Sequence, residues 1–278
     1  MLAPFDACKD EAVTRSVGAE LQVSADAESE IELQLAVARS PGLTIEEELV
    51  VTGPWGRLSA SEVSTPHHGR MHLVTLPPGL TTISYSATVA GQAAVPAPDP
   101  LALSEYRRAS RYATSDTFGG YAQSEFGDVA DDELLPSVSA WVGTRLAYVP
   151  GSSGPTDGAS ETLLGGAGVC RDYAHLVITL LRALGVPARL VAVYAPGCDP
   201  MDFHAVVEAY VTDGWYVVDA TALAPRSSLV RIATGRDAAD TAFMSTARGH
   251  ALLTYCEVSA VADDGLPDDD LFRPVRLA

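Results

Sequence analysis

The sequence predicts an α+β protein in which an N-terminal antiparallel β-sandwich precedes a unit made of a buried helix and antiparallel strands. Three observations support this fold class. Apolar residues recur with a period of two up to about residue 93, prolines cluster at 93–100, and a long apolar helix is followed by strand-like runs. The 278 residues are enough for one large domain or two ordinary ones.

Residues 1–95 are expected to form the sandwich. In "SEIELQLAVAR", Ile31, Leu33, Leu35 and Val37 form an apolar face, as in a half-buried strand. "RMHLVTL" and "TTISYSATVAG" repeat this alternation, and the second places Ile83, Tyr85, Ala87 and Val89 on one face. Turn clusters such as "TGPWG" and "PPG" lie between such runs, a spacing typical of a sandwich.

The segment "AAVPAPDP" at 93–100 contains three prolines and is expected to be a stiff, extended connector. We therefore place a boundary here, with a second domain over 101–278. The segment "DDELLPSVSAWVGTRLAYVPG" at 131–151 is predicted to be helical up to about Ala147, and Gly151–Gly158 is expected to be a loop rich in Gly, Ser and Pro.

Residues 170–184 are apolar almost all round, which indicates a helix buried on most sides. Gly185 is expected to end it, and Pro187 prevents it from resuming. Strand-like runs follow as "ARLVAVYA", "FHAVVEAYV" and "WYVVDAT".

Cys170 stands at the predicted start of this helix, after "GGAGV". Unpaired N–H groups and the positive end of the helix dipole favour a thiolate there, and the same N–H groups can hold an oxyanion. The competing interpretation is a small buried apolar residue, which is the usual role of a free cysteine.

A nucleophilic thiol needs a base, and the six histidines allow elimination. His67, His68 and His72 lie in the predicted sandwich, and His250 lies late in the chain. His175 is five residues beyond Cys170 on the same helix, about 140° around its axis. It is expected to be a packed, hydrogen-bonded side chain, which leaves His204 as the candidate base.

A hairpin turn at "TDG" would place Asp219 near His204. If Tyr210 opposes Trp215, Val206 opposes Asp219, and His204 becomes a diagonal neighbour of Asp219. A tight two-residue loop would instead place Asp219 opposite Glu208 and leave His204 too far away. In the first register Asp219 orients the imidazole, and the three side chains form a triad with a thiol nucleophile. The alternative role for Asp219 is to cap the turn after its strand.

Composition excludes several partners. The net charge of -18 repels nucleic acid and anionic membrane surfaces. No C-x-x-C pair and no zinc-ligand spacing is present, so we expect no metal and no other cofactor.

The acidic N-terminus does not fit a signal peptide, and no apolar run has membrane-spanning length. We therefore expect free thiols and a cytoplasmic location.

The motifs "GVCRDYAHL", "ALGVPARLVAVY", "DFHAVVEAY" and "WYVVDAT" resemble, in this order, the bacterial transglutaminase-like domain, a papain-like cysteine enzyme fold. The resemblance covers about residues 100–250, and the preceding β-region resembles the sandwich often fused to it. Cys170, His204 and Asp219 fall on the family's catalytic positions. The chain departs from the family at Val206, where a tryptophan is common. Tyr148 is a candidate second oxyanion donor, with ordinary packing as the alternative.

The resemblance implies acyl transfer at the amide bond of a peptide or protein, through a thioester on Cys170. Hydrolysis of a peptide or isopeptide bond is favoured over protein cross-linking. The alternative is a binding module of the same fold that has lost activity. A coenzyme A-dependent acyltransferase with a similar triad is a third hypothesis, which an acidic surface does not favour. The sequence leaves the substrate and the oligomeric state open.

Overall fold

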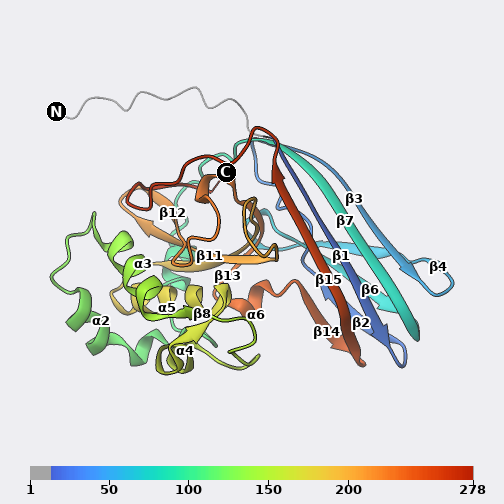
Figure 1. Cartoon of the computed structure of the whole chain (residues 1–278), viewed down its shortest axis with the longest axis horizontal. Coiled ribbons are helices and arrows are strands. Elements are labelled where there is room, and N and C mark those ends of the chain that lie inside the picture. The colour runs from blue at the N-terminus through green and yellow to red at the C-terminus, as the bar shows by residue number, and fades with distance from the viewer. Residues whose placement is uncertain (1–13, 278) are drawn as a thin grey trace.

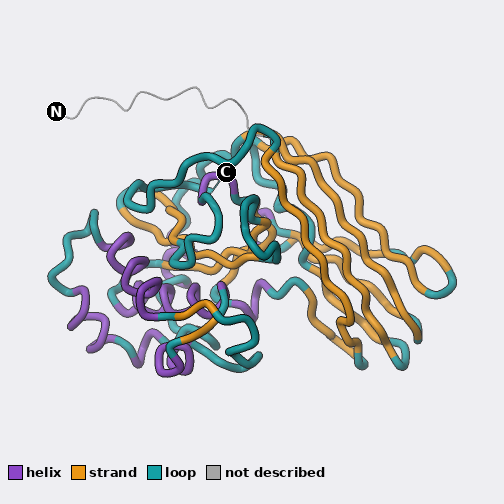
Figure 2. The backbone as a smooth tube through the Cα atoms, in the orientation of Figure 1, coloured by secondary structure: helices purple, strands orange, loops and turns teal. Residues whose placement is uncertain are grey.

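The computed structural model describes residues 14–277. Long antiparallel strands form one unit, and helices with a smaller sheet form the other, packed beside it (Figures 1 and 2). The five-stranded sheet and the two four-stranded sheets are antiparallel, and the helices lie in the second unit. The predicted α+β fold class is confirmed. No helix in the described range is both long and apolar enough to cross a membrane.

The sandwich contains two antiparallel sheets, with strand orders β15-β1-β7-β3-β4 and β14-β2-β6-β5. The strands are β1 (Arg15–Ala25), β2 (Ser29–Leu33), β3 (Leu43–Gly53), β4 (Gly56–Arg57), β5 (Ala60–Ser64), β6 (Arg70–Leu76), β7 (Gly79–Gly91), β14 (Met244–Arg248) and β15 (Ala251–Ala262). The predicted inward face of β7 is confirmed, because Ile83, Tyr85, Ala87 and Val89 are all buried.

The strand expected over 31–37 is shorter than predicted. β2 ends at Leu33, yet every residue from 33 to 38 is buried. The backbone leaves the sheet here and packs against the second unit. Gln34 donates its backbone N–H to Phe243 at 2.9 Å, and the Tyr194 hydroxyl donates to the Leu35 carbonyl at 2.9 Å. Because this segment is covered on both sides, its residues do not alternate between buried and exposed as they would in a half-exposed strand.

The strand pairing departs from the division expected at residue 95 in one respect. β14 pairs with β2, and β15 pairs with β1 along eleven residues of β1. Both strands come from beyond the second unit, so the chain returns to complete each sandwich sheet (Figure 1). The division into domains therefore stays a prediction, and it does not include this return.

The second unit is built on a four-stranded antiparallel sheet with strand order β12-β11-β10-β13. Its strands are β10 (Ala188–Tyr194), β11 (His204–Val211), β12 (Gly214–Val218) and β13 (Val230–Gly235), and β8 (Ala147–Tyr148) and β9 (Ala167–Gly168) form a small parallel pair. The helices are α1 (Pro100–Glu105), α2 (Gly119–Phe126), α3 (Leu134–Arg145), α4 (Ala159–Gly165), α5 (Cys170–Ala183) and α6 (Ala238–Thr241), with 3₁₀ turns η1 (Pro66–His68), η2 (Ser115–Thr117) and η3 (Arg226–Ser228).

Helix α5 packs on β10 and β11 and contributes more residues to the apolar core of this unit than any other element, including the fully buried Leu176, Ile178 and Leu180. It begins at Cys170 and ends one residue before the predicted limit. Gly185 follows in a left-handed conformation with φ of 82°. The Val186 N–H then bonds back to the Leu181 carbonyl at 3.0 Å, a common way to end a helix.

The hairpin of β11 and β12 has the register that brings His204 toward Asp219. Tyr210 pairs with Trp215, and the turn between the paired Val211 and Gly214 consists of residues 212–213. Thr212 takes a positive φ of 53°, as a tight hairpin turn requires. The expectation that a two-residue loop would place Asp219 opposite Glu208 is wrong. Because the two-residue loop consists of residues 212–213, Glu208 pairs with Val217, and Asp219 lies one residue beyond the Val207–Val218 pair.

Candidate active site

The start of α5 is held by Asp172, which is completely buried. Its Oδ2 accepts hydrogen bonds from the Val169 N–H at 2.9 Å and from the Ser153 hydroxyl at 2.5 Å. Its other oxygen accepts from Arg171, which also donates to the Gly154 carbonyl. Asp172 therefore caps the helix and ties the 151–158 loop to the residues around Cys170.

Gly168 is required for this arrangement. A Cβ at residue 168 would lie 2.6 Å from the Cβ of Asp172, too close for any side chain. The glycine thus lets β9 approach the capping carboxylate directly before the helix starts. Cys170 follows as the first residue of α5 and is partly accessible.

His204 and Asp219 are joined by a short, buried contact. The Nε2 of His204 lies 2.8 Å from the Oδ2 of Asp219, and both side chains are almost completely buried. His204 begins β11, and Asp219 directly follows β12. The predicted diagonal neighbours are therefore in contact through their side chains.

Thr221 completes the support of Asp219, and the sequence did not single it out. Its hydroxyl donates to the Asp219 Oδ1 at 2.6 Å, and its backbone N–H donates to the same oxygen at 2.9 Å. One carboxylate oxygen thus contacts the histidine while the other caps the turn. The two roles considered as alternatives for Asp219 occur together.

The electrostatics of the pair follow from burial and charge. Burial alone would lower the pKa of His204, but the charge and hydrogen bond of Asp219, together with a hydrogen bond from Cys170, raise it well above 6.5. Burial raises the pKa of Asp219, but the His204 charge and the bonds from His204 and Thr221 lower it overall. An imidazolium beside a carboxylate is therefore the favoured state of this pair at neutral pH.

The Cys170 thiol is a neighbour of the His204 imidazole. Its proximity to the imidazole contributes to the raised pKa of His204. Because Nε2 is engaged by Asp219, Nδ1 is the ring nitrogen left for the thiol. The sulfur also lies 3.9 Å from the Phe203 carbonyl oxygen. The structure therefore brings together all three side chains that the sequence singled out.

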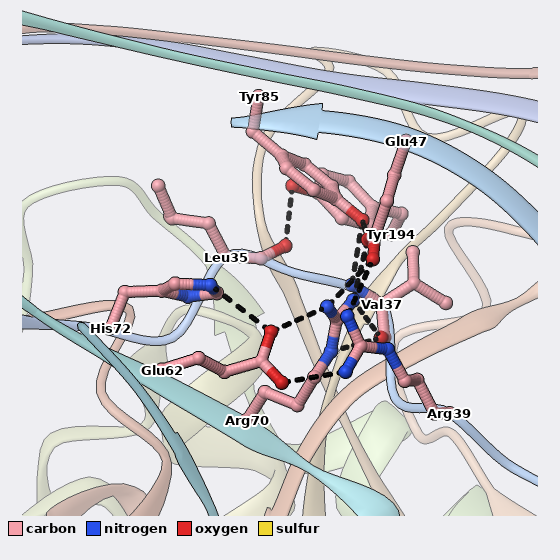
Figure 3. A network of polar contacts seen from close by, with 9 residues as sticks. All are labelled: Leu35, Val37, Arg39, Glu47, Glu62, Arg70, His72, Tyr85 and Tyr194. Atoms are coloured by element: carbon pink, nitrogen blue, oxygen red, sulfur yellow. Dashed lines mark hydrogen bonds and ion pairs between the residues drawn. The ribbon is translucent and has the colours of Figure 1, made fainter. Parts of the chain in front are cut away.

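Phe203 connects this site to the sandwich. Its ring stacks on Phe243 with 4.8 Å between centroids and packs against Tyr194 at 5.7 Å. Tyr194 in turn donates to the Leu35 carbonyl and stacks on Tyr85. Figure 3 shows the polar network that continues from there, in which Tyr85, Arg70 and Glu47 fix the segment that contains Val37. These contacts fix Phe203, the residue before His204, against residues that pack on the sandwich.

Tyr148 stands beside the start of α5 because of the short parallel pairing of β8 and β9. Tyr148 pairs with Gly168, which shortens α3 relative to the predicted helix end at Ala147. The Tyr148 phenol lies beside the Cys170 backbone N–H. Burial and the neighbouring Cys170 raise the pKa of Tyr148 above 10, so the phenol keeps its proton. The phenol and the Cys170 N–H therefore converge on one location.

The other histidines do not join this site. His175 accepts a hydrogen bond from the Ala238 N–H at 3.1 Å and stacks on Tyr112, as expected for a packed side chain. His67 bonds to Tyr106, whereas His72 lies 3.5 Å from Glu62, so these two histidines have different partners. Val206, at the position where the family often has tryptophan, is 1% exposed and pairs with Val191 in the sheet core.

The role of Asp219 in setting the charge of His204 can be measured directly. In Asp219→Asn we expect the pKa of His204 to fall below 6.5, because burial then acts without the opposing carboxylate. Because the pKa of His204 is raised in the folded native protein, its protonation stabilises the fold fully at pH values below 6.5. This stabilisation is lost as the pH rises through the pKa of His204 in the folded state, and Asp219→Asn should lack it. NMR titration of the His204 ring measures its pKa in the native protein and in Asp219→Asn. Asp213→Asn is the control, and an unchanged His204 titration in Asp219→Asn would contradict this account.

Comparisons with known proteins give matches in both sequence and structure. A family model described as "Transglutaminase-like superfamily" matches residues 125–220, which include Cys170, His204 and Asp219. A crystal structure described as that of a "putative cysteine protease" from Cytophaga hutchinsonii is 30% identical, with a TM-score of 0.84. The match covers 97% of this chain and 95% of that one, so both units are shared.

Curated relatives match over shorter lengths. An uncharacterized protein of Mycobacterium leprae is 31% identical over 119 residues, 40% of this chain and 42% of that protein. One of Mycobacterium tuberculosis is 32% identical over 83 residues, 30% of this chain and 26% of that protein. The chain thus spans less than half the length of these mycobacterial relatives. The family model and the full-length structural match together show that the chain belongs to the transglutaminase-like superfamily, a family of cysteine enzymes.

Proposed function

We propose that the protein is a cysteine-dependent acyl-transfer enzyme that cleaves amide bonds of peptides or proteins through a thioester on Cys170. The observation that carries this is the contact series from the Cys170 thiol through His204 to Asp219, at the start of a buried helix. A thiol, a base and an orienting carboxylate in this order are the parts of nucleophilic catalysis. The name of the Cytophaga hutchinsonii relative adds support for hydrolysis over cross-linking.

In this mechanism the Cys170 thiolate attacks the carbonyl carbon of the amide. The carbonyl oxygen becomes an oxyanion that accepts hydrogen bonds from the Cys170 N–H and the Tyr148 hydroxyl. The His204 imidazolium then gives its proton to the departing amine, and the thioester remains on Cys170. In the second half His204 takes a proton from water, which attacks the thioester, and the acid and the free thiol are released.

Asp219 acts on this sequence through His204. It keeps the ring in the orientation that presents Nδ1 to sulfur, and it stabilises the imidazolium that forms with the thiolate. Thr221 holds Asp219 in turn through two hydrogen bonds. We assign the catalytic roles to Cys170 and His204, an oxyanion-binding role to Tyr148, and positioning roles to Asp219 and Thr221.

The oxyanion role of Tyr148 has a specific kinetic signature. In Tyr148→Phe we expect kcat for amide cleavage to fall about 100-fold, since one donor to the developing charge is lost, with little change in KM. Tyr121→Phe, a partly exposed tyrosine of α2, is the matched control. Equal kcat in Tyr148→Phe and the native protein would remove the phenol from the mechanism and leave the Cys170 N–H as the donor.

The proposed function is tested by incubating the purified protein with a peptide library and with glutamine peptides plus a primary amine. Mass spectrometry then distinguishes free acids from new amides. We expect free acids to dominate and both products to be absent in Cys170→Ala. Amide products in excess would instead assign cross-linking, and products that persist in Cys170→Ala would refute the thioester route.

We also propose a cytoplasmic location. Cys170, Cys198 and Cys256 are free thiols in the described part of the chain. A reducing compartment keeps thiols in this form and keeps a cysteine nucleophile active.

A further inference from the structure

A cavity of about 630 Å³ lies between the sandwich and the face of the second unit's sheet that is away from α5. The connector residues 92–97 form one wall, and Arg189, Glu208, Trp215 and Arg231 form the opposite wall. This cavity is separate from the candidate active site. Glu208 lies four residues beyond His204 on β11, about 13 Å along the strand.

The buried charges on the sheet side of the cavity do not balance. Arg189 and Arg231 each lie 2.7 Å from an oxygen of Glu208, and the three side chains are 3%, 12% and 3% exposed. Two guanidinium groups thus share one carboxylate, so among residues 14–277 one positive charge is left without a partner. Removing a charge from water is costly unless an opposite charge is near, and this is the arrangement that an anion would neutralise.

The neighbouring groups do not cancel this excess. His67 lies beside Arg189, with 3.2 Å between its Nδ1 and the guanidinium. Burial, followed by the charges of Arg189 and Arg231, lowers the pKa of His67 to about 4, so at neutral pH it is uncharged. Arg276 also lines the cavity and adds a further positive charge, and its acidic partner Asp213 lies on the exposed hairpin turn. The local surplus contrasts with the net charge of -18 for the whole chain.

The cavity lining includes both hydrogen-bond donors and apolar side chains. Arg231 uses three of its five N–H donors on Glu208 and Thr234, and within residues 14–277 the other two have no partner. Pro41, Val95, Pro96 and Leu277 give the cavity an apolar part. His67 and His68, at its edge, both adopt positive φ, at 58° and 65°. Consecutive residues in this conformation are strained, which is common at ligand-binding sites.

We propose that this cavity binds a small organic acid, with its carboxylate on the side of Arg189 and Arg231 and its apolar body against the connector. The volume is within the range of small-molecule sites, and guanidinium groups bind carboxylates through paired N–H donors. The charge selects an anion, and the apolar lining selects an organic acid over an inorganic one. This inference does not depend on the reaction at Cys170.

Calorimetric titration of the full chain with benzoate, benzamide and inorganic phosphate tests the proposal. We expect saturable binding of one benzoate per chain, and at least tenfold weaker binding of benzamide, which has the same shape without the charge. Phosphate binding without benzoate binding would contradict an organic acid, and the absence of saturable benzoate binding would overturn the site.

Variants locate the site on the protein. Arg231→Gln is expected to weaken benzoate binding at least tenfold, because it removes the surplus charge and leaves Glu208 paired with Arg189. Arg57→Gln, on an exposed arginine of the sandwich, is the control and should bind as the native protein does. If Arg231→Gln fails to fold, Arg276→Gln serves as the second variant, with the same direction expected. Unchanged affinity in the folded variant would place the benzoate elsewhere and refute the proposal.

Discussion

Replacing Cys170 by alanine is expected to reduce amide cleavage to the uncatalysed background. Every step of the proposed route requires a bond to this sulfur, so the loss should exceed about 1,000-fold. The substitution removes one atom at a partly accessible position and leaves the Asp172 cap intact, so folding should be retained. Turnover of a substrate found in the peptide library measures the effect, and circular dichroism checks the fold.

Two further cysteines provide matched controls for this experiment. Cys198→Ala and Cys256→Ala should keep most of the activity, because the Cys198 thiol donates to the Pro200 carbonyl and Cys256 lies on β15 of the sandwich. Burial raises the pKa of Cys198, and burial raises the pKa of Cys256 to about 11, so neither is a reactive thiolate at neutral pH. Activity that survives in Cys170→Ala but disappears in Cys198→Ala would move the nucleophile to the loop before His204.

Replacing His204 by alanine is expected to lower the alkylation rate of Cys170 by iodoacetamide about tenfold or more at neutral pH. A thiol without a basic partner is only a few per cent ionised at that pH, and alkylation requires the thiolate. The substitution also removes the partner of Asp219, because the buried His204 ring contacts that carboxylate. His250→Ala is the control, since this residue lies on the sandwich side before β15.

Site-resolved mass spectrometry of the labelled peptides measures the alkylation of Cys170, Cys198 and Cys256 in one sample. In the native protein Cys170 should react faster than Cys198 or Cys256, and in His204→Ala this advantage should disappear. Equal rates at Cys170 in the two proteins would show that His204 does not activate the thiol. Such a result would favour the alternative hypothesis of an inactive binding module.

The parts of the fold that sequence patterns predicted are those with strong local signals. The α5 helix combines an all-round apolar pattern with a glycine stop at residue 185, and both are properties of adjacent residues. The inward face of β7 has a clear period of two. The hairpin register followed from one assumed pair, Tyr210 with Trp215, and that pair is present.

The return of β14 and β15 to the sandwich could not be predicted in the same way. Their partners, β2 and β1, lie more than two hundred residues earlier, and alternation along a strand does not identify its neighbour. Residues 34–38 were misjudged for a related reason. Their apolar pattern predicted a strand, but they are buried between the two units, where contacts such as that of Leu35 with Tyr194 replace sheet pairing.

The candidate site shows the same limit. Cys170, His204 and Asp219 were singled out because their residue types and order indicate a thiol, a base and an orienting acid. Thr221 was missed, although its position two residues after Asp219 is the spacing at which a side-chain carboxylate caps a turn. The bond between Ser153 and Asp172 likewise depends on a loop position that no local pattern specifies.

The most direct test of the central claim is to trap the acyl group on sulfur. The native protein is mixed with p-nitrophenyl acetate, quenched in acid and analysed by peptide mass spectrometry. We expect a burst of one equivalent of p-nitrophenol and one acetyl group on the Cys170 peptide, removed by hydroxylamine as a thioester would be, and no burst in His204→Ala. An acetyl group spread equally over Cys170, Cys198 and Cys256, or no burst at all, would contradict the proposal that Cys170 is the nucleophile.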